Sequence, residues 1–98
     1  EFLPREEVIQ QLQRPFQSLM DQYDIDDIGI FEEEGEKIDI LGYNVKKSGK
    51  TYHIHMPYQK NHYGELAPLR NEWILETDEP AKDDQRGFQT LEGVLRKL

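Results

Sequence analysis

The sequence predicts an α+β fold, a two-layer sandwich in which a helix, a four-stranded antiparallel meander and a second helix follow one another. Apolar residues recur every three or four positions near both ends of the chain, as in amphipathic helices. Between these ends lie short segments rich in Ile, Tyr and Val that are separated by turn residues. Each element has one apolar side, and placing both helices on one face of the sheet buries these sides together.

The first helix is predicted from Pro4 to Tyr23. Proline suits the first turn of a helix, where its missing N–H needs no partner. The apolar stripe stays in phase across Pro15, so we expect one kinked helix and not two unrelated ones. The stripe consists of Val8, Ile9, Leu12, Phe16, Leu19, Met20 and Tyr23.

The first two strands are predicted at residues 28–32 and 36–47. A three-residue hairpin loop at 33–35, with glycine in the left-handed position, connects them. This register brings four isoleucines together, in the pairs Ile28–Ile40 and Ile30–Ile38. From Leu41 onward the apolar positions of the second strand switch from even to odd numbers. We therefore expect a β-bulge at residues 41–42.

A third strand is predicted from Lys50 to Tyr58, after a two-residue turn at Ser48-Gly49. This turn places six apolar residues on one face, in the pairs Leu41–Met56, Tyr43–Ile54 and Val45–Tyr52.

The rest of the chain is expected to form a loop, one more strand and a helix. Residues 59–71 form the loop, which is long for so small a domain. The fourth strand spans residues 72–77, and a polar connection spans residues 78–84. The final helix runs from about Leu91 to the end, with Thr90 as its N-cap.

Length, charge and composition limit the classes of function. The chain has 98 residues, and we expect residues 1–98 to form a single domain. The net charge of −8 disfavours general binding to nucleic acids or anionic membranes. We expect no membrane association, because no run approaches the ~20 apolar residues of a membrane helix. The chain has no cysteine, which is consistent with the cytoplasm, where we expect the protein to act.

The charge is distributed unevenly along the chain. Nine acids and one base lie between Asp21 and Asp39, whereas residues 40–64 contain no acid, four lysines and all three histidines. The acidic hairpin tip is either a solvated turn or a contact for a basic partner. Its candidate contact residues are Glu32, Glu33, Glu34 and Glu36.

Two histidines occupy alternate positions of the third strand. His53 and His55 should therefore point to the same face, away from the core if Ile54 faces it. Two imidazoles can share a divalent metal when a third ligand joins them, and His62 in the long loop is the candidate. We expect instead an exposed or contacting surface without a metal. The candidate contact surface consists of Asn44, His53, His55, His62 and Tyr63.

We find no catalytic motif in the sequence. Neither Ser18 nor Ser48 has the glycine context of a nucleophile elbow, and no G-x-G phosphate loop occurs. The segment that begins at Asp24 starts like a calcium loop, but its twelfth position is Gly35 where a glutamate is required. We therefore assign no catalytic, cofactor-binding or metal-binding residue and expect no cofactor.

These observations favour a small, acidic, noncatalytic domain that acts as a protein-interaction or regulatory module. Its partner is an unidentified protein or a second copy of the chain. The first alternative is a small metal-binding protein or enzyme centred on His53, His55 and His62. The second is a nucleic-acid or nucleotide binder that uses the lysine-rich hairpin, which the net charge disfavours.

Overall fold

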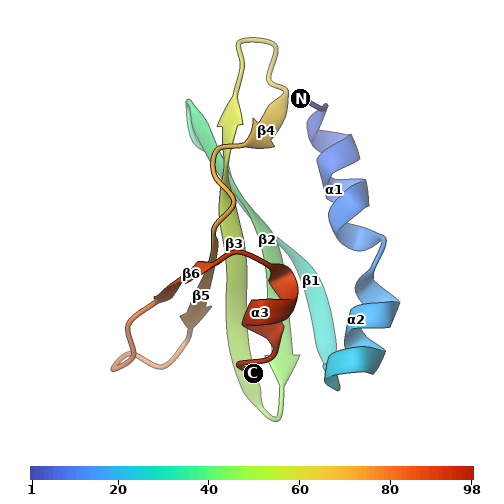
Figure 1. Cartoon of the computed structure of the whole chain (residues 1–98), viewed down its shortest axis with the longest axis vertical. Coiled ribbons are helices and arrows are strands. Elements are labelled where there is room, and N and C mark those ends of the chain that lie inside the picture. The colour runs from blue at the N-terminus through green and yellow to red at the C-terminus, as the bar shows by residue number, and fades with distance from the viewer.

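The structure, a computed structural model, describes residues 1–98 as a six-stranded antiparallel sheet with three helices (Figure 1). The α+β class and the antiparallel sheet are confirmed, but the predicted number of four strands is wrong. The helices are α1 (Arg5–Gln13), α2 (Phe16–Tyr23) and α3 (Leu91–Leu95). The strands are β1 (Asp27–Glu33), β2 (Ile38–Lys47), β3 (Lys50–Lys60), β4 (Leu66–Pro68), β5 (Trp73–Thr77) and β6 (Gln85–Phe88).

The strands follow one another across the sheet in the order β1-β2-β3-β5-β6, and β4 pairs with β3. Strand β4 pairs with the last residues of β3, and β5 pairs with its earlier part, so β4 and β5 share one edge of β3. The segment expected to be a loop at 59–71 therefore contains a strand. Strand β6 lies in a mostly polar, exposed segment, and its pairing with β5 shifts register between Trp73 and Leu75. Strands β4 and β6 are too short and irregular to give a periodic pattern of apolar residues in the sequence.

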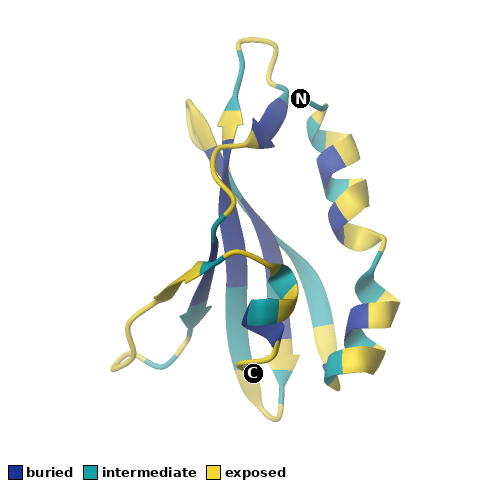
Figure 2. Cartoon of the chain, in the orientation of Figure 1, coloured by how far each residue is buried: buried dark blue, intermediate teal, exposed yellow.

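One face of the sheet carries the hydrophobic core, to which all three helices contribute. The central strands hold the most deeply buried positions, which are dark blue in Figure 2. Leu41 and Ile54 have no exposed surface, and burying a side chain of this size stabilises the fold by about 1.5–3 kcal/mol. The Tyr43 hydroxyl crosses this core and donates a 2.8 Å hydrogen bond to the carbonyl oxygen of Leu12 in α1. None of the helices has the length and apolar composition needed to cross a membrane.

The first helical segment is divided into two helices and is not the single kinked helix we expected. Helix α1 ends at Gln13 and α2 begins at Phe16, with Pro15 as its N-cap residue. Proline has no N–H to donate to the carbonyl four residues earlier, so the hydrogen bonding of α1 stops there. The apolar stripe still stays in phase, because Leu12 and Leu19 both reach the core.

The predicted pairing of β1 with β2 is wrong. Ile28 pairs with Val45 and Ile30 pairs with Tyr43, so both isoleucines lie beside core residues of β2. The connection spans residues 34–37, one residue longer than the predicted three-residue loop and displaced from it.

The predicted β-bulge is also wrong, because β2 pairs with β3 without interruption. The change of parity in β2 has another cause. Ile38 and Ile40 lie on the face opposite the core, and Asp39 takes the inward position between them with only 2% of its surface exposed.

Lys60 of β3 stabilises the buried carboxylate of Asp39. Asp39 Oδ1 accepts hydrogen bonds from Lys60 Nζ at 2.8 Å and from the Gly35 N–H at 3.1 Å. The hydrogen bond to Asp39 raises the pKa of Lys60. Lys60 Nζ also donates to the Gly35 carbonyl oxygen at 2.8 Å. A buried charge needs such partners, and here they also fix the β1–β2 connection.

The predicted pairing of β2 with β3 is confirmed at all three positions: Leu41–Met56, Tyr43–Ile54 and Val45–Tyr52. Ser48 and Gly49 both have positive φ angles, 52° and 77°, as a two-residue hairpin turn matched to the strand twist requires. The predicted fourth strand is confirmed as β5. The last helix begins at Leu91 as predicted but ends at Leu95, short of the predicted end at Leu98, and Thr90 Oγ1 accepts the Gly93 N–H at 3.0 Å.

Candidate functional site

The candidate site is the sheet face opposite the helices, which we call the open face. Side chains alternate along a strand, so the residues between the core positions of each strand point to the open face. The strand pairing arranges them in three rows across the sheet: Gly29–Asn44–His53–Glu76, Phe31–Gly42–His55–Ile74 and Glu33–Ile40–Pro57.

Asn44 holds His53 in a defined orientation. The Asn44 Nδ2 group donates to the carbonyl oxygen of Ile30 at 3.1 Å, and Asn44 Oδ1 lies 2.5 Å from His53 Nδ1. Because Oδ1 can only accept, Nδ1 of His53 carries the proton of this bond. His53 Nε2 takes no part in it and can accept a hydrogen bond when the ring is neutral.

Three rings form a cluster on the open face, which we call the aromatic cluster: Phe31, His53 and His55. Phe31 stacks on His55 with a centroid distance of 5.1 Å and an interplanar angle of 20°, and it lies 5.1 Å from the His53 ring. In the pairing scheme Gly42 lies between Phe31 and His55. A Cβ atom on Gly42 would lie 1.9 Å from the carbonyl oxygen of Ile54, so the close approach of β2 and β3 requires glycine.

His55 is the buried member of the aromatic cluster, with 9% of its surface exposed. Its Nε2 lies 3.8 Å from Glu76 Oε1, and its Nδ1 has no hydrogen-bond partner. Burial lowers the pKa of His55 below its ordinary value, although the nearby Glu76 carboxylate acts in the opposite direction. The ring is therefore neutral at pH 7.

A pocket of about 220 Å³ opens beside His55 on the open face. We call it the arginine pocket; it is lined by Ile40, His55, Pro57, Arg70, Ile74 and Arg86. Arg70 Nε is hydrogen-bonded to Glu72 at 3.2 Å. Arg86 forms no ion pair within the chain and is exposed. The pocket thus combines apolar and arginine side chains and leaves one guanidinium free.

The structure separates the predicted contact surface into two places. Asn44, His53 and His55 lie together on the open face, whereas His62 and Tyr63 lie in the β3–β4 connection with their ring centroids 4.3 Å apart. Five residues of strand separate His55 from the end of β3, roughly 17 Å at 3.3 Å per residue. No group of three or more His, Cys, Asp and Glu side chains is arranged to hold a metal ion. The metal centre built on three histidines is therefore not formed.

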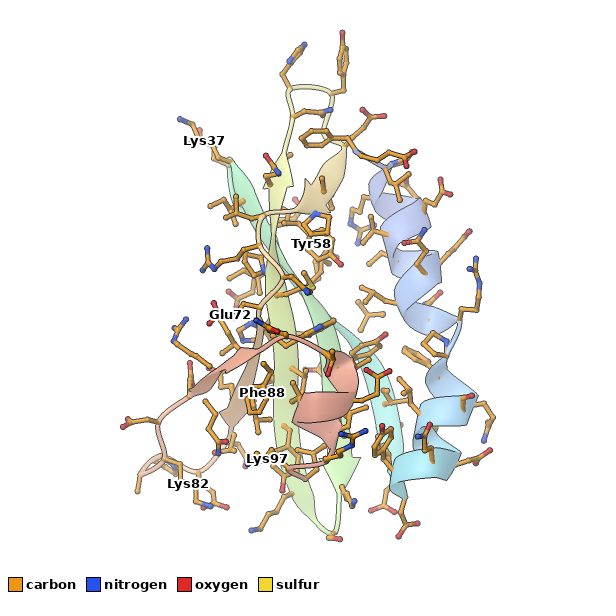
Figure 3. All side chains as sticks on the ribbon, viewed as in Figure 1. Lys37, Tyr58, Glu72, Lys82, Phe88 and Lys97 are labelled. Carbon is orange, nitrogen blue, oxygen red and sulfur yellow. The ribbon has the colours of Figure 1, made fainter.

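The predicted acidic contact is divided between the two faces of the sheet. Glu32 forms a double hydrogen bond with the Arg5 guanidinium of α1 and so faces the helices. Glu33 belongs to the open face, and Glu34 and Glu36 are exposed in the connection to β2. Figure 3 shows Lys37 of this connection at the same end of the molecule as the β3–β4 hairpin, and the Lys60 N–H donates to the Lys37 carbonyl oxygen.

Sequence reasoning missed Phe31 and five of the six residues that line the arginine pocket: Ile40, Pro57, Arg70, Ile74 and Arg86. Side chains alternate along β1, so Phe31 lies on the other face from Ile28 and Ile30, and this alternation could have identified it from the sequence. The two arginines carry no such signal. They come from a loop and from a short irregular strand, and only the folded sheet brings them to one pocket.

Comparison with known proteins assigns the chain to a family. No curated protein matches the sequence. One family matches residues 2–98, a span that includes every helix and strand and the whole open face. The chain belongs to this family, a family of unknown function (DUF5634).

Proposed function

We propose that the protein is a noncatalytic protein-interaction domain that binds its partner through the open face. One observation carries the proposal: the aromatic cluster and the arginine pocket lie on a sheet face outside the helix-covered core. An antiparallel sheet needs only one packed face, and the other is free to meet solvent or a partner. We propose with it that the fold has two layers, the helices and the sheet, so that the second face of the sheet stays uncovered.

The chemistry of the open face suits a protein contact. Interface cores are enriched in aromatic residues and arginine, which are also the most frequent energetic hot spots. The hydrogen bonds of Asn44 hold the His53 ring before any partner arrives, and Phe31 is stacked in place on His55. Ordered side chains lose less conformational entropy on binding, so this surface is preorganised.

We also propose that the chain forms a single domain and that it acts in the cytoplasm. We treat residues 1–98 as one folding unit, because α1 and α3 contribute to the same hydrophobic cluster. We place its action in the cytoplasm, with the absence of cysteine as the supporting observation.

The test compares proteins captured from the native lysate by four immobilised forms of the full chain. These are the wild type, His53→Glu, Ile40→Glu and the control Gln13→Glu, which places the same charge on the exposed side of α1. We expect the same proteins to be recovered by the wild type and the control, and to be lost with both open-face variants. Circular dichroism of each form establishes that it is folded. Equal recovery by all four folded forms would place the contact elsewhere.

A further inference from the structure

Two residues on opposite flanks of the open face, Glu33 and Arg86, carry opposite charges, and Glu76 adds a carboxylate to the arginine side. Glu33 lies on β1, the edge strand at one side of the sheet, and is exposed. Arg86 lies on β6, the edge strand at the other side, and Arg70 lines the same pocket. Apolar residues lie between the flanks, among them Ile40 and Pro57 of the row that begins at Glu33.

This arrangement is complementary to itself. Consider two copies with their open faces together and a twofold axis that runs parallel to the strands between β2 and β3. The operation exchanges the flanks and keeps each row at its own height, so β1 of one copy lies over the β5 side of the other. Strands are about 4.8 Å apart, so Glu33 moves roughly 10–15 Å across the sheet and lies over the arginine pocket. Arg86, whose guanidinium has no ion-pair partner within its own chain, lines this pocket and can bind the Glu33 carboxylate of the other copy.

We propose that the open face binds a second copy of this chain, with Glu33 of each copy entering the arginine pocket of the other. The inference rests on the proposed function, because it uses the same face and names its partner. The contact is isologous, so each dimer contains it twice and the assembly closes at two copies. The free Arg86 gains a carboxylate partner in a pocket whose other walls are largely apolar, where an ion pair is stronger than in water.

The same operation places the aromatic cluster at the centre of the contact. Phe31 of each copy comes to lie over the region of His55 and Ile74 of the other, since these residues share one row. Gly42 belongs to that row near the axis, where it is buried beside the stacked rings of Phe31 and His55. Face-to-face sheets pack about 10 Å apart with their strand directions within about 30° of each other, and an axis parallel to the strands satisfies this condition.

The net charge of −8 opposes self-association over long distances. The Debye length is about 8 Å at 0.15 M salt, so this repulsion is screened while the contacts within the interface persist. The assembly is therefore measured at 0.15 M sodium chloride.

The experiment is sedimentation equilibrium of the full chain, with the wild type, Glu33→Arg, Arg86→Glu and the control Arg96→Glu at the C-cap of α3. We expect the wild type and the control to sediment at twice the chain mass of 11.6 kDa. Each open-face variant should raise the dimer dissociation constant by about 100-fold, because the reversed charge occurs in both contacts and costs about tenfold in each. Circular dichroism verifies folding, and Arg86→Gln serves as a milder variant if Arg86→Glu is unfolded.

Mixing the two open-face variants gives the decisive measurement. In a mixed dimer of Glu33→Arg with Arg86→Glu, one contact joins the two substituted residues and the other joins the two native ones. Both contacts then pair opposite charges, so the mixture should recover the dimer that neither variant forms alone.

Three results would overturn the inference: a monomeric wild type at several hundred micromolar, variants that dimerise like the wild type, or a mixture that stays monomeric. The proposed function has a separate outcome. If the chain is monomeric and the captured proteins are still lost with His53→Glu and Ile40→Glu, the open face binds a different protein.

Discussion

At the scale of single residues, Gly42 has the tightest backbone surroundings on the open face. Gly42 lets β2 and β3 approach so closely that a Cβ atom there would lie 1.9 Å from the Ile54 carbonyl oxygen and 2.7 Å from the Cα atom of His55. Both neighbours are backbone atoms, which cannot rotate away as the end of a side chain can. The stacking of Phe31 on His55 lies beside the same position.

We therefore expect Gly42→Ala to destabilise the protein. Overpacking typically costs about 1–3 kcal/mol, and relief here requires the two central strands to separate. Gly29→Ala is the matched control, because a Cβ atom at Gly29 has nothing within 4 Å. Urea denaturation of both variants measures the difference, and equal midpoints would contradict the close approach.

His55 predicts how stability depends on pH. Burial lowers its pKa in the folded state, so the unfolded chain takes up the proton at a higher pH than the folded chain does. The contribution of neutral His55 to the free energy of unfolding is complete above the ordinary histidine pKa of about 6.5, and it is lost as pH falls below that value. The free energy of unfolding of the wild type should therefore decrease from pH 8 to pH 5.

His55→Phe retains a ring that stacks on Phe31 but removes the titrating group. Its decrease in stability over the same pH range should be smaller than that of the wild type, as measured by urea denaturation at both pH values. His62→Phe removes one histidine outside the open face and serves as the control. The same loss in His55→Phe as in the wild type would assign the dependence to other groups.

At the scale of elements, α3 is the helix least able to hold its own shape. It has five residues, whereas isolated helices need roughly 12–15 residues to be even marginally stable. It persists because Val94 and Leu95 are almost completely buried and because Thr90 caps its first turn. Packing against β5 and β6 therefore substitutes for intrinsic helix stability.

Thr90→Ala should lower the free energy of unfolding by about 1 kcal/mol, because the Gly93 N–H loses its acceptor. Ser18→Ala, an exposed position within α2, is the control and should change stability by less than about 0.5 kcal/mol. Amide hydrogen exchange at Gly93 provides a local readout. An unchanged exchange rate in Thr90→Ala would show that the cap contributes nothing.

At the scale of the whole molecule, the acidic segment from Asp21 to Asp39 is only partly neutralised. Glu32 is paired with Arg5 and Asp39 with Lys60, but Asp24, Asp27 and Glu36 form no ion pair. Like charges this close repel one another, and the repulsion is released on unfolding. The folded state therefore carries an electrostatic cost that salt can screen.

We expect 0.1 M sodium chloride to raise the melting temperature, because the Debye length falls to about 10 Å. Glu36→Lys should raise it in low salt and reduce its dependence on salt, since the change replaces one of the unpaired acids with a base. Scanning calorimetry at a fixed protein concentration measures both effects. A melting temperature that is highest without added salt would indicate that attractive ion pairs dominate.

Local pattern alone predicted the fold class, the β2–β3 register, strand β5 and the start of α3. Alternation fixes which side chains share a face, and the two-residue turn at Ser48-Gly49 fixes the register because it leaves no length to vary. The capping threonine likewise acts within three residues of itself. The shared face of His53 and His55 follows from the same alternation.

Only the tertiary structure decided the β1–β2 register, the inward position of Asp39 and the composition of the open face. The residue that holds the β1–β2 connection is Lys60, which lies 25 positions from Gly35. Strands β4 and β6 are short and persist only by pairing with strands already formed. Arg70 and Arg86 reach one pocket through that pairing. Their placement depends on free energies between residues distant in sequence, which no local pattern records.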